Sequence, residues 1–382
     1  MPVKSQRTAL VRMLALVATV SLSGCGGGGS GSMATMHSAS CSGCTFMYAT
    51  TNAGQILKFP LRAPPSIAMS TSIAGPANSL GMAVVTVANL PDSPYLYVSD
   101  PGANSIRIYT VSSADGGLSE VSASPFVVGG TPGEMASFGT LLYVATSSGS
   151  IEALNVNADG SLSNISGSPF TAELGLTHLA AISSSTVSNA NFLYAANTED
   201  PKGSISAFTI EAGGALEPIP GSPFPTVPNG GPAGFYGGGI FLYVALKNAD
   251  AVAAFAIGDD GSLTPIAGSP FRAGRGTFSL GSSEGFLVAT NNTDGTISSY
   301  SVDSVTGVLT AVAGSPFAGS TASGDAFYSG TTFFVPNVQS DTINAFESDS
   351  TGAVQPLNAS SLKTAAGPVA LSIVAFPVTD PP

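Results

Sequence analysis

The stretch FLYVALKNADAVAAFAIGDDGSLTPIAGSPF, at Phe241–Phe271, contains three apolar runs separated by two short polar segments. The segment between the second and third runs includes Asp-Gly, which supplies the positive φ angle that hairpin turns need. The runs are apolar on both faces, as expected for strands that are buried between two neighbouring sheets. This stretch therefore predicts three consecutive antiparallel strands of one unit.

The unit recurs along the chain. Its first run starts at positions that lie 45 to 51 residues apart, namely Phe46, Tyr95, Leu141, Phe192, Phe241, Phe286 and Phe333. A further apolar run precedes each later start, as at Gly81–Val87 and Gly234–Ile240. A period of this length, built only from strand-like runs, is the signature of a β-propeller with one four-stranded blade per repeat. The sequence predicts an all-β, seven-bladed β-propeller over residues 46–376.

The motif Gly-Ser-Pro-Phe closes the unit in four copies, and Ala-Ser-Pro-Phe, ending at Phe126, closes a fifth. The four copies end at Phe170, Phe224, Phe271 and Phe317. Because proline lacks a backbone N–H, it is tolerated at the edge of a sheet. We expect the motif to end the outermost strand, with Gly-Ser turning the chain and Phe lying between two blades.

The two ends of the repeat array complement each other. The unit at Phe46 has no inner strand before it, whereas Gly367–Phe376 follows the last unit and matches the inner-strand pattern. We expect this C-terminal run to supply the missing inner strand, which closes the ring and leaves no open blade edge.

Residues 1–24 have the features of a secretory signal. Basic residues precede an apolar run at Met13–Leu22, and Leu-Ser-Gly-Cys ends at Cys25. This ending resembles the lipobox of bacterial lipoproteins, in which the Cys is lipidated; an ordinary secretory signal is the alternative. We expect a monomeric protein of the cell envelope, held by a lipid on Cys25 at the periplasmic or outer face of a membrane.

Residues 25–45 form a Gly/Ser-rich tether, and residues 377–382 form a C-terminal tail. The tether contains Cys41 and Cys44 as Cys-Ser-Gly-Cys, with His37 upstream. We favour a disulfide between the two cysteines in an oxidising compartment. Free thiols and a His-Cys-Cys metal site are the alternatives, although a fourth metal ligand is missing nearby.

The charge balance limits the partners. The chain has 23 Asp+Glu against 11 Lys+Arg, a net charge of −12, so no basic stripe is available to neutralise phosphates. This excludes nucleic acid as a partner. The chain also lacks Trp and a P-loop, and we expect no cofactor and no bound metal.

Residues at the starts of inner strands surround the mouth of a propeller channel. Alignment of the third position of each start places Glu134, His178, Thr277 and Asp325 there, with Arg275 nearby. His178 beside an acid could act as a general base, and Arg275 could hold a carboxylate or an oxyanion. We therefore predict His178, Glu134 and Arg275 as catalytic residues and Asp325 and Thr277 as ligand-binding residues. The alternative is that the acids are a solvated rim and the His fills space.

The order of the FLYVA strand, S-I-x-A-F strand, Asp-Gly turn and GSPF motif resembles the seven-bladed β-propeller lactonase family over Phe46–Phe376. This family includes 6-phosphogluconolactonase-like proteins and is related to YVTN surface repeats. Its Gly-Pro-Arg-His motif corresponds to Gly175–His178, where the His is kept and Thr177 replaces the Arg. We expect a module that binds an unidentified small ligand or protein through its loop-rich face. A lactone hydrolase or isomerase, as the resemblance implies, is the alternative.

Overall fold

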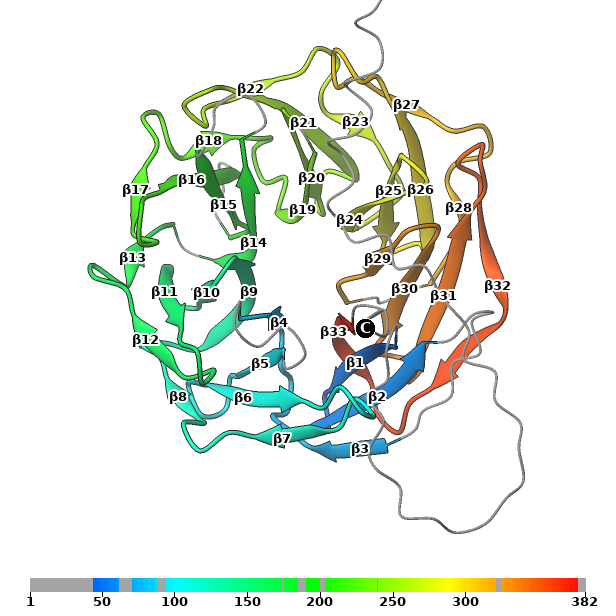
Figure 1. Cartoon of the computed structure of the whole chain (residues 1–382). Coiled ribbons are helices and arrows are strands. Elements are labelled where there is room, and N and C mark those ends of the chain that lie inside the picture. Colours follow the sequence, from blue (N-terminus) through cyan, green and yellow to red (C-terminus); the bar gives the residue numbers. More distant parts are fainter. Residues whose placement is uncertain are drawn as a thin grey trace, which may run out of the picture.

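The computed structural model describes residues 44–61, 71–87, 94–173, 175–184, 190–199, 203–238, 240–320 and 324–376. Its strands form seven antiparallel sheets, which are arranged as blades around a common axis (Figure 1). The described residues contain no helix, and hence none that could span a membrane. The predicted all-β, seven-bladed propeller is confirmed.

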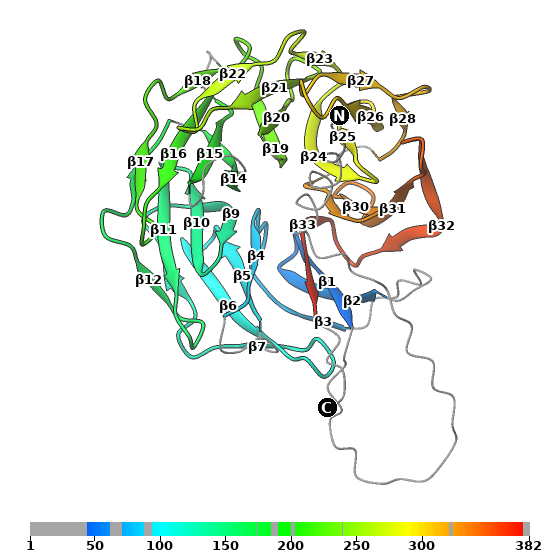
Figure 2. The same ribbon diagram turned by 45° about the horizontal axis from the view of Figure 1, so that its top comes forward.

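Each blade runs from an inner strand near the axis to a short outer strand at the rim, as the view in Figure 2 also shows. Blade 1 consists, from the axis outward, of β33 (Pro368–Ala375), β1 (Thr45–Thr51), β2 (Gln55–Leu61) and β3 (Thr71–Ala74). In each of blades 2 to 6 a fifth, two-residue strand pairs with the third strand, like the fourth strand does. Blade 2 consists of β4 (Met82–Val85), β5 (Tyr95–Asp100), β6 (Ser105–Val111), β7 (Leu118–Glu120) and β8 (Phe126–Val127). Blade 3 consists of β9 (Pro132–Phe138), β10 (Leu141–Thr146), β11 (Ser150–Val156), β12 (Leu162–Asn164) and β13 (Phe170–Thr171). Blade 4 consists of β14 (Leu176–Ser183), β15 (Asn191–Asn197), β16 (Ser204–Ile210), β17 (Leu216–Pro218) and β18 (Phe224–Pro225). Blade 5 consists of β19 (Pro232–Gly238), β20 (Phe241–Leu246), β21 (Ala251–Ile257), β22 (Leu263–Pro265) and β23 (Phe271–Arg272). Blade 6 consists of β24 (Thr277–Ser283), β25 (Phe286–Asn291), β26 (Thr296–Val302), β27 (Leu309–Ala311) and β28 (Phe317–Ala318). Blade 7 consists of β29 (Phe327–Ser329), β30 (Thr332–Asn337), β31 (Thr342–Ser348) and β32 (Val354–Lys363).

The ring closes inside blade 1. Strand β33 pairs with β1 in antiparallel register, from Ala375 opposite Thr45 to Pro368 opposite Thr51. In Figure 1 the red end of the chain lies beside the blue beginning of the described part. The prediction that the C-terminal run supplies the missing inner strand is confirmed.

Apolar side chains fill the interfaces between neighbouring blades. The seven clusters of buried residues each combine side chains from two consecutive blades, including blades 7 and 1. Along β10, Leu142 and Val144 face blade 2, whereas Tyr143 and Ala145 face blade 4. Both faces of a blade are therefore buried, as the absence of polar alternation in the sequence predicts.

Tyrosine hydroxyls connect consecutive blades. Five tyrosines at one position of the second strand each donate a hydrogen bond to the carbonyl of a turn glycine in the next blade: Tyr48 to Gly116, Tyr97 to Gly160, Tyr143 to Gly214, Tyr194 to Gly261 and Tyr243 to Gly307. These distances range from 2.6 Å for Tyr48 to 3.0 Å for Tyr143. Burial raises the pKa of each of these hydroxyls, so they remain protonated donors.

The turn glycine is required for this joint. Gly160 has a φ of +79°, and a Cβ atom there would lie 2.2 Å from the ring of Tyr95 in blade 2. Gly261 repeats the arrangement against the ring of Phe192, at 2.5 Å. The Asp-Gly turn of one blade thus packs directly beneath an aromatic residue of the preceding blade.

The GSPF motif differs from our prediction, because it interrupts the outer strand instead of ending it. In blade 3, β12 and β13 both pair with β11, and Gly167–Pro169 lies between them. The hydroxyl of Ser168 accepts a hydrogen bond from the amide of Ala153, which the interrupted ladder would otherwise leave without a partner. The same serine contact occurs in all five copies, at Ser124, Ser168, Ser222, Ser269 and Ser315.

The Ser–Pro bond of each copy is cis, and the chain then returns to the sheet at the Phe. Each Phe of the motif packs against the apolar cluster between its own blade and the next, as at Phe170. Blade 7 lacks the motif and has one continuous outer strand, β32. The motif is therefore a repeated structural element of the blade edge.

We predict that Tyr143→Phe and Tyr194→Phe each lower the free energy of unfolding by about 1–2 kcal/mol, because a buried glycine carbonyl loses its donor. The measurement is chemical denaturation of the purified protein. Tyr236→Phe is the matched control, since among the described residues no hydrogen bond of its hydroxyl is found. An unchanged stability of both variants would contradict a stabilising role of the joint.

Deletion of residues 367–382 is expected to abolish cooperative unfolding, because blade 1 then loses its inner strand and the buried Leu371 and Val374. Circular dichroism during thermal melting is the measurement. Deletion of residues 377–382 alone, which follow β33, should leave the transition in place. A soluble 1–366 chain that melts like the full chain would show that the closure is dispensable.

Candidate functional site

A bulge recurs at the start of five inner strands. In β9, β14, β19, β24 and β33 the register with the second strand shifts by one residue at the same place. In blade 3, for example, Pro132 pairs with Thr146 and Met135 pairs with Val144, so that two residues lie opposite one. Such bulges re-aim a side chain and are common beside active sites.

The second bulged residue of each strand faces the axis. The equivalent positions around the ring are Gly81, Glu134, His178, Gly234, Ser279, Asp325 and Ala370, as judged from the pairing registers. Side chains at the Gly positions would clash with the next inner strand: a Cβ atom at Gly81 would lie 2.4 Å from the carbonyl oxygen of Gly133. The inner strands therefore approach closely, and the mouth of the channel is narrow.

Three of the predicted residues meet at this mouth. Glu134, His178 and Asp325 line a pocket of about 170 Å³ together with Ser279 and neighbouring backbone. His178 Nε2 lies 3.0 Å from Asp325 Oδ1. These residues belong to blades 4 and 7, which are not neighbours, so this contact spans the axis. The structure thus brings together the His and both acids that the sequence placed at the mouth.

A relay of hydrogen bonds runs from His178 through the hydroxyls of Thr177 and Thr198 to a backbone carbonyl, and its direction shows that His178 Nδ1 carries a proton. Thr198 donates to the carbonyl oxygen of Pro232, which can only accept. The Thr198 oxygen must then accept from the Thr177 hydroxyl, and the Thr177 oxygen must accept from His178 Nδ1–H. Nε2, directed at Asp325, is the ring nitrogen whose protonation can change.

Opposing effects act on the two buried groups. Burial by itself would lower the pKa of His178, but the negative charges of Asp325 and Glu134 outweigh it and raise the pKa to about 9. Burial raises the pKa of Glu134 to about 8, against the attraction of His178 and the hydrogen bond from the Leu179 amide. At neutral pH His178 is therefore an imidazolium and Glu134 a carboxylic acid.

Arg275 and Thr277 do not line this pocket. Arg275 lines a separate groove with Arg272, Asp250 and Asp294, and its amide donates to Asp294 Oδ2 at 2.8 Å. Thr277 is fully buried, and its hydroxyl contacts the carbonyl of Gly274 and the side chain of Asn291. The alignment by sequence was two residues out of register in blade 6: Thr277 is equivalent to Pro132 and Leu176, and Ser279 occupies the axis position.

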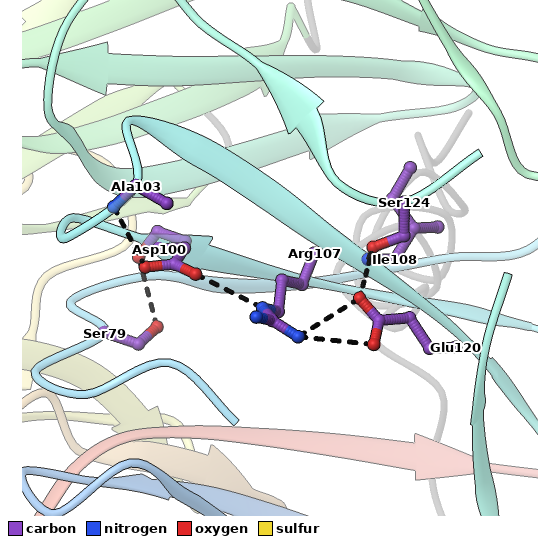
Figure 3. Close-up of polar contacts among 8 residues, drawn as sticks. Ser79, Asp100, Ala103, Arg107, Ile108, Glu120 and Ser124 are labelled. Atoms are coloured by element: carbon purple, nitrogen blue, oxygen red, sulfur yellow. Dashed lines mark hydrogen bonds and ion pairs between the residues drawn. The ribbon is translucent and has the colours of Figure 1, made fainter. Parts of the chain in front are cut away.

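The other cations of the described residues also lie away from the mouth or at its rim. Arg107 bridges Asp100 and Glu120 within blade 2, at 3.2 and 3.3 Å (Figure 3). Lys247 is the cation that affects His178, and its ammonium lies 5.6 Å from the centre of the Phe278 ring. The edge of His178 contacts the same ring, with centroids 5.3 Å apart. No sequence pattern marked Lys247, Phe278 or the relay through Thr177.

The predicted residues of the tether fall largely outside the described part. Cys25 and Cys41 lie there, and nothing is assigned to them. Cys44 is described and is disulfide-bonded, and its backbone carbonyl accepts from the Phe376 amide at 2.9 Å. Its pairing with Cys41 remains a prediction.

Comparison with known proteins agrees with this architecture. Residues 236–323 match the family model described as Lactonase, 7-bladed beta-propeller. No curated protein matches the chain significantly. A structure provisionally assigned as a 6-phosphogluconolactonase from Bacteroides fragilis aligns with a TM-score of 0.71 and 19% identity, over 90% of this chain and 100% of that one.

A periplasmic gluconolactonase from Pseudomonas aeruginosa aligns with a TM-score of 0.70 and 20% identity, over 87% of this chain and 100% of that one. Identities this low establish the shared fold and leave the activity open. The chain is therefore a seven-bladed β-propeller, and its residues 236–323 are similar to the lactonase family of such propellers.

Proposed function

We propose that the mouth of the propeller hydrolyses a lactone, with His178, Glu134 and Asp325 as the reacting groups. The observation that carries this proposal is the position of His178 Nε2, which faces Asp325 in the pocket while Nδ1–H is fixed by the relay. The family match of residues 236–323 supports the same reaction class. Arg275 takes no part, because it lines a different groove.

The protonation states suggest how the pocket becomes active. Lactone hydrolysis needs a base that takes a proton from water and an acid that protonates the departing ring oxygen. With both His178 and Glu134 protonated, the pocket lacks that base. Loss of one proton from the pair gives two tautomers, one with imidazolium and a Glu134 carboxylate and one with a bare Nε2 and a protonated Glu134. The second tautomer places a base and an acid side by side and is the reactive one.

The reaction then proceeds through a tetrahedral intermediate, which forms when water adds and collapses when the ring oxygen leaves. Water loses a proton to His178 Nε2 and attacks the carbonyl carbon of the lactone. The bond between that carbon and the ring oxygen breaks, and the ring oxygen receives the proton of Glu134. The product is the open hydroxy acid, and the proton on His178 returns to Glu134 to restore the active state. Asp325 holds the imidazole in position and stabilises its positive charge.

Charge and volume restrict the substrate. Phosphate recognition usually draws on Arg or several cations, whereas in the described part of the chain Lys247 is the cation near the mouth. A pocket of about 170 Å³ offers room for one small ring. An unphosphorylated monocyclic lactone therefore fits this site better than a phosphorylated one.

A second candidate is binding without catalysis. The groove lined by Arg272 and Arg275, together with Asp250 and Asp294, offers charges of both signs to a polar ligand or protein. We also propose that the chain is exported and held to a membrane through Cys25, as the Leu-Ser-Gly-Cys sequence suggests.

His178→Ala is expected to lower kcat/KM for a lactone at least about 100-fold, the usual contribution of a general base. The assay follows acid release from glucono-1,5-lactone and from unphosphorylated five-membered lactones, with the spontaneous rate subtracted. Arg275→Ala is the matched control and should stay within twofold of the natural protein. Equal rates for the natural protein and His178→Ala would remove the catalytic proposal and favour binding alone.

The pH dependence provides a second test. Activity should rise as the first proton leaves near pH 8 and fall as the second leaves near pH 9. In Glu134→Gln the descending limb should disappear, and the pKa of His178 should fall below about 9 because a neighbouring negative charge is lost. NMR titration of the two histidines measures this directly, with His37→Ala used to assign the signals. A His178 signal that titrates near pH 6.5 in the natural protein would refute the proposed electrostatics.

A further inference from the structure

Glu134, His178 and Asp325 are a set of metal-ligand atoms as well as a set of acid–base groups. One nitrogen or oxygen atom from each of the three lies within 4.8 Å of the other two. Ligand atoms of a tetrahedral Zn²⁺ ion, each about 2.1 Å from the metal, lie about 3.4 Å from one another. Small rotations of the two carboxylate side chains would bring the three atoms to a single ion.

The relay prepares His178 for this role. Histidine ligands of metals nearly always donate their other ring N–H to a second group, which fixes the tautomer and the ring orientation. Here Nδ1–H is donated to Thr177, and the relay ends at the Pro232 carbonyl. A neutral His178 consequently directs the lone pair of Nε2 toward both carboxylates.

The charges of the pocket also favour a cation. Neither Glu134 nor Asp325 forms an ion pair with a Lys or Arg side chain among the residues that the structure describes. Lys247 at the rim has its ammonium over the Phe278 ring. When Glu134 has lost its proton, the two carboxylates that converge in this partly buried pocket have only His178 to balance them among the described side chains.

We propose that Glu134, His178 and Asp325 bind one divalent transition-metal ion, with Zn²⁺ best matched to one imidazole and two carboxylates. Three protein ligands leave a coordination position open toward the pocket, as in catalytic zinc sites. The proposal concerns the pocket of the proposed hydrolysis but does not depend on a lactone being the substrate. The ion and the Nε2 proton exclude each other, and a loaded site would activate water at the metal.

The test is a calorimetric titration of the EDTA-dialysed full chain with Zn²⁺. A His37→Ala background removes the histidine of the tether, which could itself bind zinc. We expect one saturable equivalent, and a His178→Ala or Asp325→Asn substitution should weaken binding by at least about 10-fold. Thr177→Val keeps all three ligands and should also weaken binding by about 10-fold or more, because the tautomer is no longer fixed.

Asp294→Asn is the matched control, since this acid lines the separate groove and should leave the affinity unchanged. Visible absorption of added Co²⁺ reports the coordination, and circular dichroism confirms that each variant is folded. Absence of saturable binding, or equal affinity of the natural protein and His178→Ala, overturns the proposal. Lactone hydrolysis measured in EDTA is judged separately, so that hydrolysis without metal binding and metal binding without hydrolysis are distinguished.

Discussion

The ring depends on a hydrogen bond that is repeated from blade to blade, between a tyrosine hydroxyl and the carbonyl of a turn glycine in the next blade. Four of the five joints combine this directional bond with an aromatic ring packed on the turn glycine, and at Gly214 the side chains of Leu141 and Ile165 take the place of the ring. Apolar clusters supply most of the burial energy, but they are non-directional. The hydroxyl bond helps to fix the rotation of one blade against the next from blade 1 to blade 6, and with it the positions of their inner strands.

The candidate site is a product of this repetition. Each repeat presents one residue to the axis at an equivalent position, which lies in a bulge in five of them, so a single substitution in one repeat changes one point of a ring. Four repeats place Glu134, His178, Ser279 and Asp325 there, whereas the others place glycine or alanine. Chemistry has been added to a symmetric scaffold by changing side chains at equivalent positions, without any insertion.

The fold could be predicted from the sequence because period, strand order and turn chemistry all agree. The closing strand followed from counting inner strands. Glu134, His178 and Asp325 were found by alignment, but Thr277 was chosen in place of Ser279. The run Gly276–Phe278 has the same Gly-polar-apolar pattern as Gly133–Met135, which put blade 6 two residues out of register. The position of the Arg275 side chain and the relay from His178 to Pro232 depend on side-chain geometry between blades. The spacing of motifs along the sequence does not determine that geometry. The GSPF motif marked the blade edge correctly, although its serine bonds within the strand ladder.

The contact between His178 and Asp325 has a consequence for the size of the ring. Each joint runs from the tyrosine of one blade to the glycine of the next. An extra repeat would bring its own tyrosine and its own glycine, so the joints alone do not limit the number of blades. The distance across the axis limits the number of blades, because it increases with every blade that is added. The 3.0 Å contact between His178 of blade 4 and Asp325 of blade 7 therefore requires the diameter of a seven-bladed ring. A change in the number of repeats would therefore separate His178 from Asp325 and alter the chemistry of the pocket.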